Sequence, residues 1–208
     1  IKYMYQFVET IQIKDGIPAL IDLHQQRING TFLFFKSISP PDITSIIVDY
    51  LEKQKLLINQ IYKLRFLYNL DSSYSIQLAP YHSPVISSFT LIENNDIDYT
   101  FKSTNRAIFE QLKSSVQGEV IIVKNGFVTD TSFSNIILLK DSIWYTPKTY
   151  LLNGVQRQHL LASNKIQEKD IKASDIKCYS HIKIINALNQ ENTSCAYCID
   201  KIINASYY

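Results

Sequence analysis

The sequence predicts an α+β protein built from two unequal units. Short runs rich in β-branched and aromatic residues, which are typical of strands, alternate with segments whose apolar residues recur at helical spacing. A stretch with two prolines, Pro80 to Pro84, separates an earlier group of such segments from a later one. We therefore expect a smaller N-terminal domain over residues 1–82 and a larger C-terminal domain over residues 83–208.

The N-terminal domain begins with a strand-like run, Tyr5 to Ile13, and Asp15-Gly16 after it is a turn signal. The spacing of apolar residues from Leu20 to Ile28 indicates a helix. After Pro40 and Pro41, Asp42 is a candidate N-cap for a second helix that runs to about Asn59. Two more strands are expected, over Tyr62 to Leu70 and Tyr74 to Ala79.

The C-terminal domain has one strong hairpin signal, the Asn125-Gly126 dipeptide after the apolar run EVIIV. Further strands and helices follow from the same patterns. The expected strands are Val85 to Ile92, Asn135 to Leu139 and Ile143 to Thr146, and the expected helices are Thr104 to Val116 and Gly154 to Ser163.

Composition excludes several classes of protein. With 46% hydrophobic and 19% charged residues the chain has the balance of a folded soluble protein, and no apolar run is long enough to span a membrane. A net charge of +2 without a basic block argues against a nucleic-acid partner. The cysteines, Cys178, Cys195 and Cys198, are odd in number, which favours a reducing cytoplasm over a disulfide framework. Cys195 and Cys198 form a lone CxxC, and the scattered histidines disfavour a metal site.

Four segments carry more specific information. They are HQQR (His24 to Arg27), FKSTNR (Phe101 to Arg106), VTDTSFSN (Val128 to Asn135) and TPKTYLLNGVQR (Thr146 to Arg157). Their order and intervals resemble those of class IV aminotransferases over nearly the whole chain. WYTP, from Trp144 to Pro147, is similar to the pattern of a short bacterial subgroup. The resemblance implies the two-domain fold type IV, as in D-amino-acid aminotransferase, with pyridoxal phosphate at the domain junction, a cofactor-binding C-terminal domain and a homodimer.

The resemblance assigns the central chemical roles to Lys102 and Asp130. Lys102 matches the family lysine that forms a Schiff base with the cofactor and then acts as a general base. Asp130 matches the acid that holds the pyridine nitrogen, although the family usually has the longer Glu at this position. The plain alternatives are a solvated surface lysine and an Asx-turn residue.

The same resemblance assigns residues that bind the cofactor phosphate. Arg27 matches the arginine of the family HxxR motif, which suits bidentate bonding to a phosphate. Gly154 permits a tight turn before a helix whose first N–H groups bind an anion, with Val155 and Gln156 at the contacting positions and Gln in place of the usual Thr. A late strand-to-turn segment, IINAL, offers Asn186 and Ala187 as a second contact; alternatively it is an ordinary core strand.

Substrate contacts are expected from the first domain. Gln12 stands where the family often has Arg in its first strand, and Arg65 resembles a strand arginine that meets a substrate carboxylate in branched-chain enzymes. Arg65 is alternatively a solvated strand residue.

The activity implied is that of a lyase or a transaminase acting on a small amino substrate. KSTNR resembles the K-x-x-N-R pattern of aminodeoxychorismate lyase more than the branched-chain form, which favours formation of p-aminobenzoate and pyruvate. A D-amino-acid or branched-chain transaminase is the main alternative. A non-catalytic homologue, or an unrelated α+β binding protein in which the four matches are coincidental, stays open.

Overall fold

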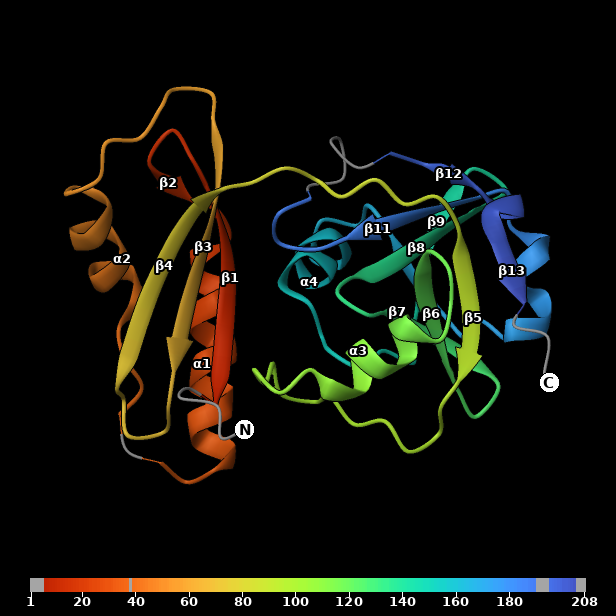
Figure 1. The fold of residues 1–208 in the computed structure, drawn as a ribbon, viewed down its shortest axis with the longest axis horizontal. Coiled ribbons are helices and arrows are strands. Elements are labelled where there is room, and N and C mark those ends of the chain that lie inside the picture. The colour runs from red at the N-terminus through yellow and green to blue at the C-terminus, as the bar shows by residue number, and fades with distance from the viewer. Residues whose placement is uncertain (1–5, 38, 190–194, 205–208) are drawn as a thin grey trace. The chain divides into compact units, whose positions relative to one another are not determined.

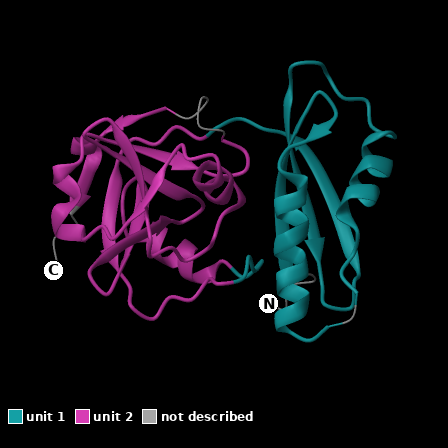
Figure 2. Cartoon of the chain, turned by 180° about the vertical axis from the view of Figure 1, so that it is seen from behind, with its two compact units in different colours: residues 1–83, 101–105 teal, residues 84–100, 106–208 magenta. Residues whose placement is uncertain are grey.

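The computed structural model describes residues 6–37, 39–189 and 195–204. The chain forms two compact units, residues 1–83 with 101–105, and residues 84–100 with 106–208, which are coloured separately in Figure 2. Both units combine sheets with helices, so the α+β prediction is confirmed. The segment 101–105, which carries Lys102, groups with the first unit, whereas the sequence-based division assigned it to the second.

The first unit is a four-stranded antiparallel sheet in the order β2-β1-β3-β4, with two helices (Figure 1). Its elements are β1 (Phe7–Lys14), β2 (Ile17–Pro18), α1 (Ile21–Phe34), α2 (Ile43–Leu51), β3 (Ile61–Tyr68) and β4 (Tyr74–Pro80). The β1–β2 turn contains Asp15 and Gly16, both at positive φ, as the sequence indicates.

Strand alternation explains which face of this sheet meets the helices. Ile11 and Ile13 of β1 are fully buried in one core with Ile28 of α1 and Ile47 of α2. Since side chains alternate along a strand, Glu9 points to this same helix-covered face. The even-numbered positions of β1, among them Gln12, lie on the opposite face.

The second unit contains two sheets, in the orders β13-β5-β6-β7 and β10-β9-β8-β11-β12 (Figure 1). The strands of the first sheet are β5 (Phe89–Glu93), β6 (Glu119–Lys124), β7 (Phe127–Thr131) and β13 (Ile202–Asn204). Those of the second are β8 (Asn135–Lys140), β9 (Ile143–Pro147), β10 (Gln167–Lys169), β11 (His181–Ile185) and β12 (Tyr197–Cys198). The helices are α3 (Ala107–Ser114), α4 (Val155–Ala162) and two 3₁₀ segments, Ala173–Cys178 and Ile199–Lys201.

The apolar run of β6 is buried on both faces. Ile121 and Val123 join the core between the two sheets, whereas Val120 and Ile122 pack with Phe109 of α3. A strand covered on both sides needs continuous hydrophobicity, which is why this run does not alternate with polar residues. The hairpin after it is confirmed, because Asn125 and Gly126 both have positive φ.

Three predicted elements differ in extent, for physical reasons. The helix expected to reach Asn59 ends at Leu51, and Asn59 adopts a left-handed φ that a helix excludes. The helix expected from Thr104 begins at Ala107, because the Thr104 N–H is bonded to the Gln6 carbonyl. The strand expected from Val85 begins at Phe89, where its pairing with β6 starts. Among the described residues, no helix is long and apolar enough to cross a membrane.

Candidate functional site

Lys102 is held through its backbone on the edge of the first unit's sheet. The Val8 N–H donates to the Lys102 carbonyl at 3.0 Å, and Ser103 forms an antiparallel bridge with Phe7. The segment containing Lys102 and Ser103 therefore lies beside β1 as a short irregular strand at the edge of the sheet. The lysine is anchored to a rigid element rather than carried on a free loop, as a precisely placed amine requires.

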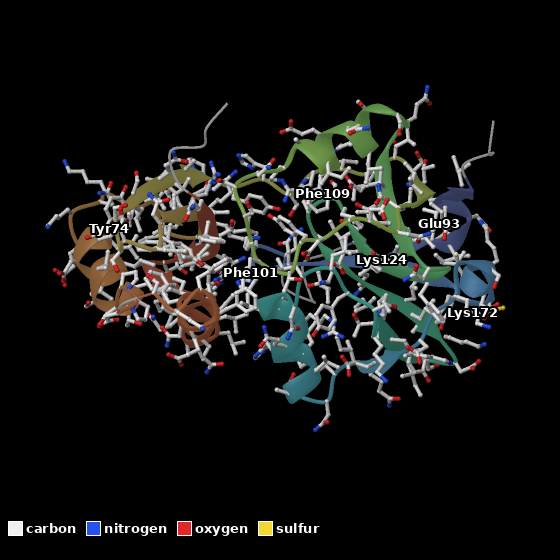
Figure 3. The ribbon with its side chains drawn as sticks, turned by 90° about the horizontal axis from the view of Figure 1, so that it is seen from below. Tyr74, Glu93, Phe101, Phe109, Lys124 and Lys172 are labelled. Atoms are coloured by element: carbon white, nitrogen blue, oxygen red, sulfur yellow. The ribbon has the colours of Figure 1, made fainter. Side chains whose placement is uncertain are left out.

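An aromatic cluster fixes the residue before the lysine. The Phe101 ring, labelled in Figure 3, lies 4.7 Å from that of Phe34, 5.0 Å from that of Phe35 and 6.5 Å from that of Phe7, between ring centroids. These rings belong to β1 and to the C-terminal end of α1. Packing on one side and backbone bonds on the other thus restrict the segment at Lys102.

Arg27 and His24 lie one turn apart on α1 and both bind Glu9 of β1. The Arg27 Nε donates to Glu9 Oε1 at 2.8 Å and its Nη2 donates to Oε2, while His24 Nδ1 lies 2.5 Å from Oε2. Burial alone would raise the pKa of Glu9, but the Arg27 charge and the bonds from His24 and Arg27 outweigh it and hold the pKa at about 2. Glu9 is therefore a permanent carboxylate that orients Arg27.

His24 is a buried neutral imidazole. Burial lowers its pKa, and the charges of Arg27 and Lys102 add to this effect, against the opposing influence of Glu9. The Lys102 ammonium is thus close enough for its charge to act on this group. Nδ1 donates to Glu9, so Nε2 is the bare nitrogen, and within the described residues it has no hydrogen-bond partner. Neither Glu9 nor His24 was assigned a role from the sequence.

Asp130, on β7, is a buried carboxylate of a different kind. Its Oδ2 accepts the backbone N–H groups of Leu151 and Leu152, both at 3.0 Å, and its Oδ1 accepts Asn135 Nδ2 at 2.8 Å. Burial raises its pKa to about 6, although these bonds and the charge of Arg157 oppose the shift. None of the ion pairs in the described part of the chain involves Asp130. This is not the local side-chain bonding of an Asx turn.

The loop that supplies the two N–H groups is held by Arg157. This arginine is 2% exposed; its Nη1 donates to Asn153 Oδ1 at 3.2 Å and its Nη2 to the Pro147 carbonyl at 3.1 Å. Its guanidinium also lies over the Tyr150 ring and pairs with Glu168. Arg157 was quoted in a motif but given no role, because a buried structural arginine has no distinctive sequence signal.

Gly154 is the N-cap of α4, but not for the reason that the sequence suggests. Its φ of −66° is open to any residue, so no tight left-handed turn is involved. An ideal Cβ at this position would lie 2.0 Å from Asn135 Oδ1, so a side chain here would require the Asn135 amide to move. Val155 and Gln156 follow with buried side chains. The first intrahelical bond of α4 is donated by the Gln158 N–H, so the N–H groups of Val155 and Gln156 have no carbonyl partner within the helix.

Asn186 closes a turn directly after β11, so the predicted strand-to-turn segment is confirmed. Its Oδ1 accepts the N–H groups of Leu188 and Asn189, and its Nδ2 donates to Ser134 Oγ at 2.6 Å. The turn containing Asn186 and Ala187 is therefore tied to the loop that follows Asp130.

Arg65 and Gln12 lie on the other face of the first unit's sheet. Arg65 is paired with Thr10 of β1, which places it on the face of Gln12 and opposite Glu9, and its Nη1 donates to Gln77 at 3.0 Å. The sheet thus separates the two predicted substrate residues from Arg27. Cys178, Cys195 and Cys198 are free and exposed, and the described residues contain no cluster of metal-ligand type.

Comparisons with known proteins identify the family and the fold. The profile of the family described as Amino-transferase class IV matches residues 6–191. An uncharacterized protein of Haemophilus influenzae is 35% identical over 89% of this chain and 99% of its own. A crystal structure of a proposed 4-amino-4-deoxychorismate lyase from Haemophilus somnus superposes with a TM-score of 0.83, at 31% identity, covering 91% of this chain and 100% of that one. A proposed amino-acid aminotransferase from Mesorhizobium loti shares the fold, with a TM-score of 0.78 at 17% identity, over 97% of this chain and 100% of its own.

The match to the family profile spans nearly the whole chain and includes all four motifs. The chain therefore belongs to the class IV aminotransferase family.

Proposed function

We propose that this chain binds pyridoxal phosphate covalently at Lys102 and catalyses an aminodeoxychorismate lyase-like reaction that releases p-aminobenzoate and pyruvate. The bound cofactor supplies an aldehyde that condenses with amines and a protonated ring that accepts an electron pair. The single observation that carries the proposal is the state of Asp130.

Asp130 has the properties needed to hold a protonated pyridine nitrogen. A buried carboxylate without a cationic partner is costly, and here its donors are neutral amides. A cationic ring N–H would supply the missing charge and lower the raised pKa of Asp130. The shorter Asp thus fits the ring-binding role, because the loop N–H groups of Leu151 and Leu152 are brought to it.

Arg27 and the first turn of α4 offer donors suited to the cofactor phosphate. Glu9 orients the Arg27 guanidinium through two hydrogen bonds, and a guanidinium suits a phosphate by bidentate bonding. The first turn of α4 contains no acidic residue and presents the N–H groups of Val155 and Gln156, which suits an anion.

Lys102 performs the proton transfer in this scheme. When the cofactor is bound, Lys102 Nζ would hold its aldehyde carbon, and as a free amine it would accept the proton of the substrate's α carbon. The nearby His24 is neutral, so it cannot act as a competing cation at neutral pH. A base of this kind must be deprotonated to work.

The lyase assignment is supported by the residues after the lysine and by the relative from Haemophilus somnus. Arg106 ends the KSTNR motif; its Nη2 donates to the Ser132 carbonyl, directly after the strand of Asp130, and its Nη1 donates to Tyr99 at 3.1 Å. Its guanidinium also lies 4.5 Å from the centroid of the Phe109 ring. The arginine of the lyase-like pattern is therefore built into the part of the second unit that carries Asp130.

Product analysis tests the reaction. With pyridoxal phosphate and aminodeoxychorismate, the protein should release p-aminobenzoate and pyruvate in equal amounts without a keto-acid acceptor. Stoichiometric loss of the cofactor's visible absorbance with a simple L- or D-amino acid, restored only by a keto acid and without p-aminobenzoate, would instead establish a transaminase.

Substitution of the lysine tests the covalent link. Lys102→Ala should abolish the visible band of the lysine-bound cofactor and all turnover, while circular dichroism stays that of the wild type. Lys14→Ala, an exposed lysine at the end of β1, is the matched control and should retain both properties. An active Lys102→Ala protein would refute the assignment.

A further inference from the structure

We propose that Asn135 is a positioning residue for Asp130, and that position 154 is glycine because only glycine leaves room for the Asn135 side chain. The inference rests on the proposed function, since it concerns the carboxylate assigned to the cofactor ring. It gives Asn135 on β8 and Gly154 at the start of α4 a role in orienting the proposed ring partner.

Asn135 connects Asp130 to the loop before α4. Its Nδ2 donates both to Asp130 Oδ1 at 2.8 Å and to the Leu152 carbonyl at 2.9 Å, so both amide protons are used. The side chain is 6% exposed, and a buried amide with both protons engaged has one defined orientation. Asn135 therefore fixes the Oδ1 side of the carboxylate.

Gly154 fixes Asn135 from the opposite side. The Oδ1 of Asn135 lies 2.0 Å from where a Cβ of residue 154 would be, and its Cγ lies 3.3 Å away. Real side chains do not tolerate the first distance, so a Cβ would force the amide to turn and break its bonds to Asp130 and Leu152. The backbone of Gly154 has an ordinary negative φ, which removes conformational freedom as the reason for glycine.

The other oxygen of Asp130 is fixed independently. Its Oδ2 receives the N–H groups of Leu151 and Leu152 from the loop that Arg157 holds. A carboxylate has about four acceptor sites, and three are taken, so the free one has a set direction before a ligand arrives. Only the Oδ1 side depends on the contact between Asn135 and Gly154, which makes that contact testable by itself.

The first experiment removes the amide. Asn135→Ala deletes one donor to the carboxylate, so the pKa of Asp130 in the cofactor-free protein should rise by about one unit. A pH titration monitored by ¹³C NMR of labelled aspartate measures this pKa. The dissociation constant for pyridoxal phosphate should rise about tenfold or more. Thr146→Val is the matched control, since it removes a buried hydrogen bond to Ile136 of the same sheet and should move neither value.

The second experiment is a double-mutant cycle. Gly154→Ala should reproduce the pKa shift and affinity loss of Asn135→Ala, because its Cβ displaces the same amide. In the Asn135→Ala background the added Cβ meets no amide, so Gly154→Ala should then cost less than about threefold in affinity. A single Gly154→Ala variant that fails to fold while the double variant folds leads to the same conclusion.

The third variant makes the contact depend on pH. Asn135→Asp places a second carboxyl group beside Asp130, and only its protonated form can donate in place of the amide. The affinity for pyridoxal phosphate should approach that of the wild type at low pH and fall as pH rises, more steeply than in the wild type. The charged residue that acts on Asp130, Arg157, is unchanged in all variants.

The measurements distinguish failure of the positioning role of Asn135 from failure of the proposed function. An unshifted Asp130 pKa in Asn135→Ala, or additive effects in the cycle, would overturn the positioning role. If the wild-type protein does not bind pyridoxal phosphate at all, the proposed function fails, but the NMR measurements on the cofactor-free protein still decide whether Asn135 and Gly154 position Asp130.

Discussion

Two buried carboxylates, one in each unit, have pKa values shifted in opposite directions. Glu9 is fully buried between β1 and α1, and Asp130 is 6% exposed on β7. The pKa of Glu9 is lowered to about 2, whereas that of Asp130 is raised to about 6. Burial acts in the same direction on both, so their partners account for the difference.

The partners differ in charge. Glu9 binds a guanidinium in a bidentate arrangement, and Asp130 binds two backbone amides and one side-chain amide. A cation inside the protein compensates the cost of burying a carboxylate, and neutral donors do so only in part. The charge of Glu9 is therefore satisfied within its unit, and that of Asp130 is available to a ligand. This difference is consistent with a structural role for Glu9 and with the binding role proposed for Asp130.

The largest predicted effect is on stability. Glu9→Gln leaves Arg27 and its charge without the buried counter-ion, and breaking a buried pair in this way costs about 3–5 kcal/mol of unfolding free energy. Urea denaturation followed by circular dichroism measures it. Asp71→Asn, an exposed carboxylate of the same unit, is the control and should change little. Equal effects of the two substitutions would show that the Glu9 pair is not stabilising.

The two carboxylates should give stability opposite dependences on pH. The pKa of Glu9 falls from 4.5 to about 2, so its contribution is present above pH 4.5 and is lost as pH falls towards 2. The pKa of Asp130 rises from 3.8 to about 6, so its contribution is present below pH 3.8 and is lost as pH rises through 6. Each shift corresponds to about 3 kcal/mol.

Cofactor-free protein unfolded in urea between pH 2 and pH 8 checks both slopes. Pyridoxal phosphate should flatten the loss between pH 4 and pH 6, because a cation then compensates Asp130. No loss of stability through that range in the cofactor-free protein, or a loss that persists unchanged in Asp130→Asn, would contradict the assignment to Asp130.

Asp130→Asn should slow the chemical step. The ring nitrogen loses the carboxylate that keeps it protonated, and we expect proton removal to fall at least about a hundredfold, which is roughly 3 kcal/mol. Exchange of the substrate's α-deuterium with solvent measures this step directly. Wild-type exchange rates in the variant would reduce Asp130 to a structural residue.

The smallest effect is expected at Arg27. Arg27→Lys keeps a charge beside Glu9 but loses the planar fork, so affinity for pyridoxal phosphate should fall by about 1–2 kcal/mol with near-normal turnover at saturation. Fluorescence titration measures the affinity. Lys14→Ala serves again as the control, and an unchanged affinity in Arg27→Lys would remove this residue from the phosphate site.

Local sequence patterns predicted the features that depend on residues close together in the sequence. The Asn125-Gly126 hairpin, the Asp42 cap and the continuous apolar run of β6 follow from short-range rules, and the structure confirms all three. HQQR was quoted as a motif in which only Arg27 had a role; in the structure His24 and Arg27, three residues apart on α1, both bind Glu9.

Contacts between distant residues were not predictable in this way. Glu9 lies 18 positions before Arg27, and nothing local marks it as its partner. Asn135 and Gly154 meet only after β8 and α4 are packed, so the glycine was interpreted as a turn residue. The backbone of Lys102 bonds to Val8 of β1, which is far away in sequence, and this is why the segment 101–105 groups with the first unit although the sequence places it after the linker.

The proposed function depends most on Lys102 as the residue that binds pyridoxal phosphate covalently. Reduction with borohydride in the presence of pyridoxal phosphate, followed by proteolysis and mass spectrometry, tests it most directly. We predict one phosphopyridoxyl adduct per chain, on the peptide containing Lys102, and its loss in Lys102→Ala. No adduct, or an adduct confined to another lysine, would contradict the account.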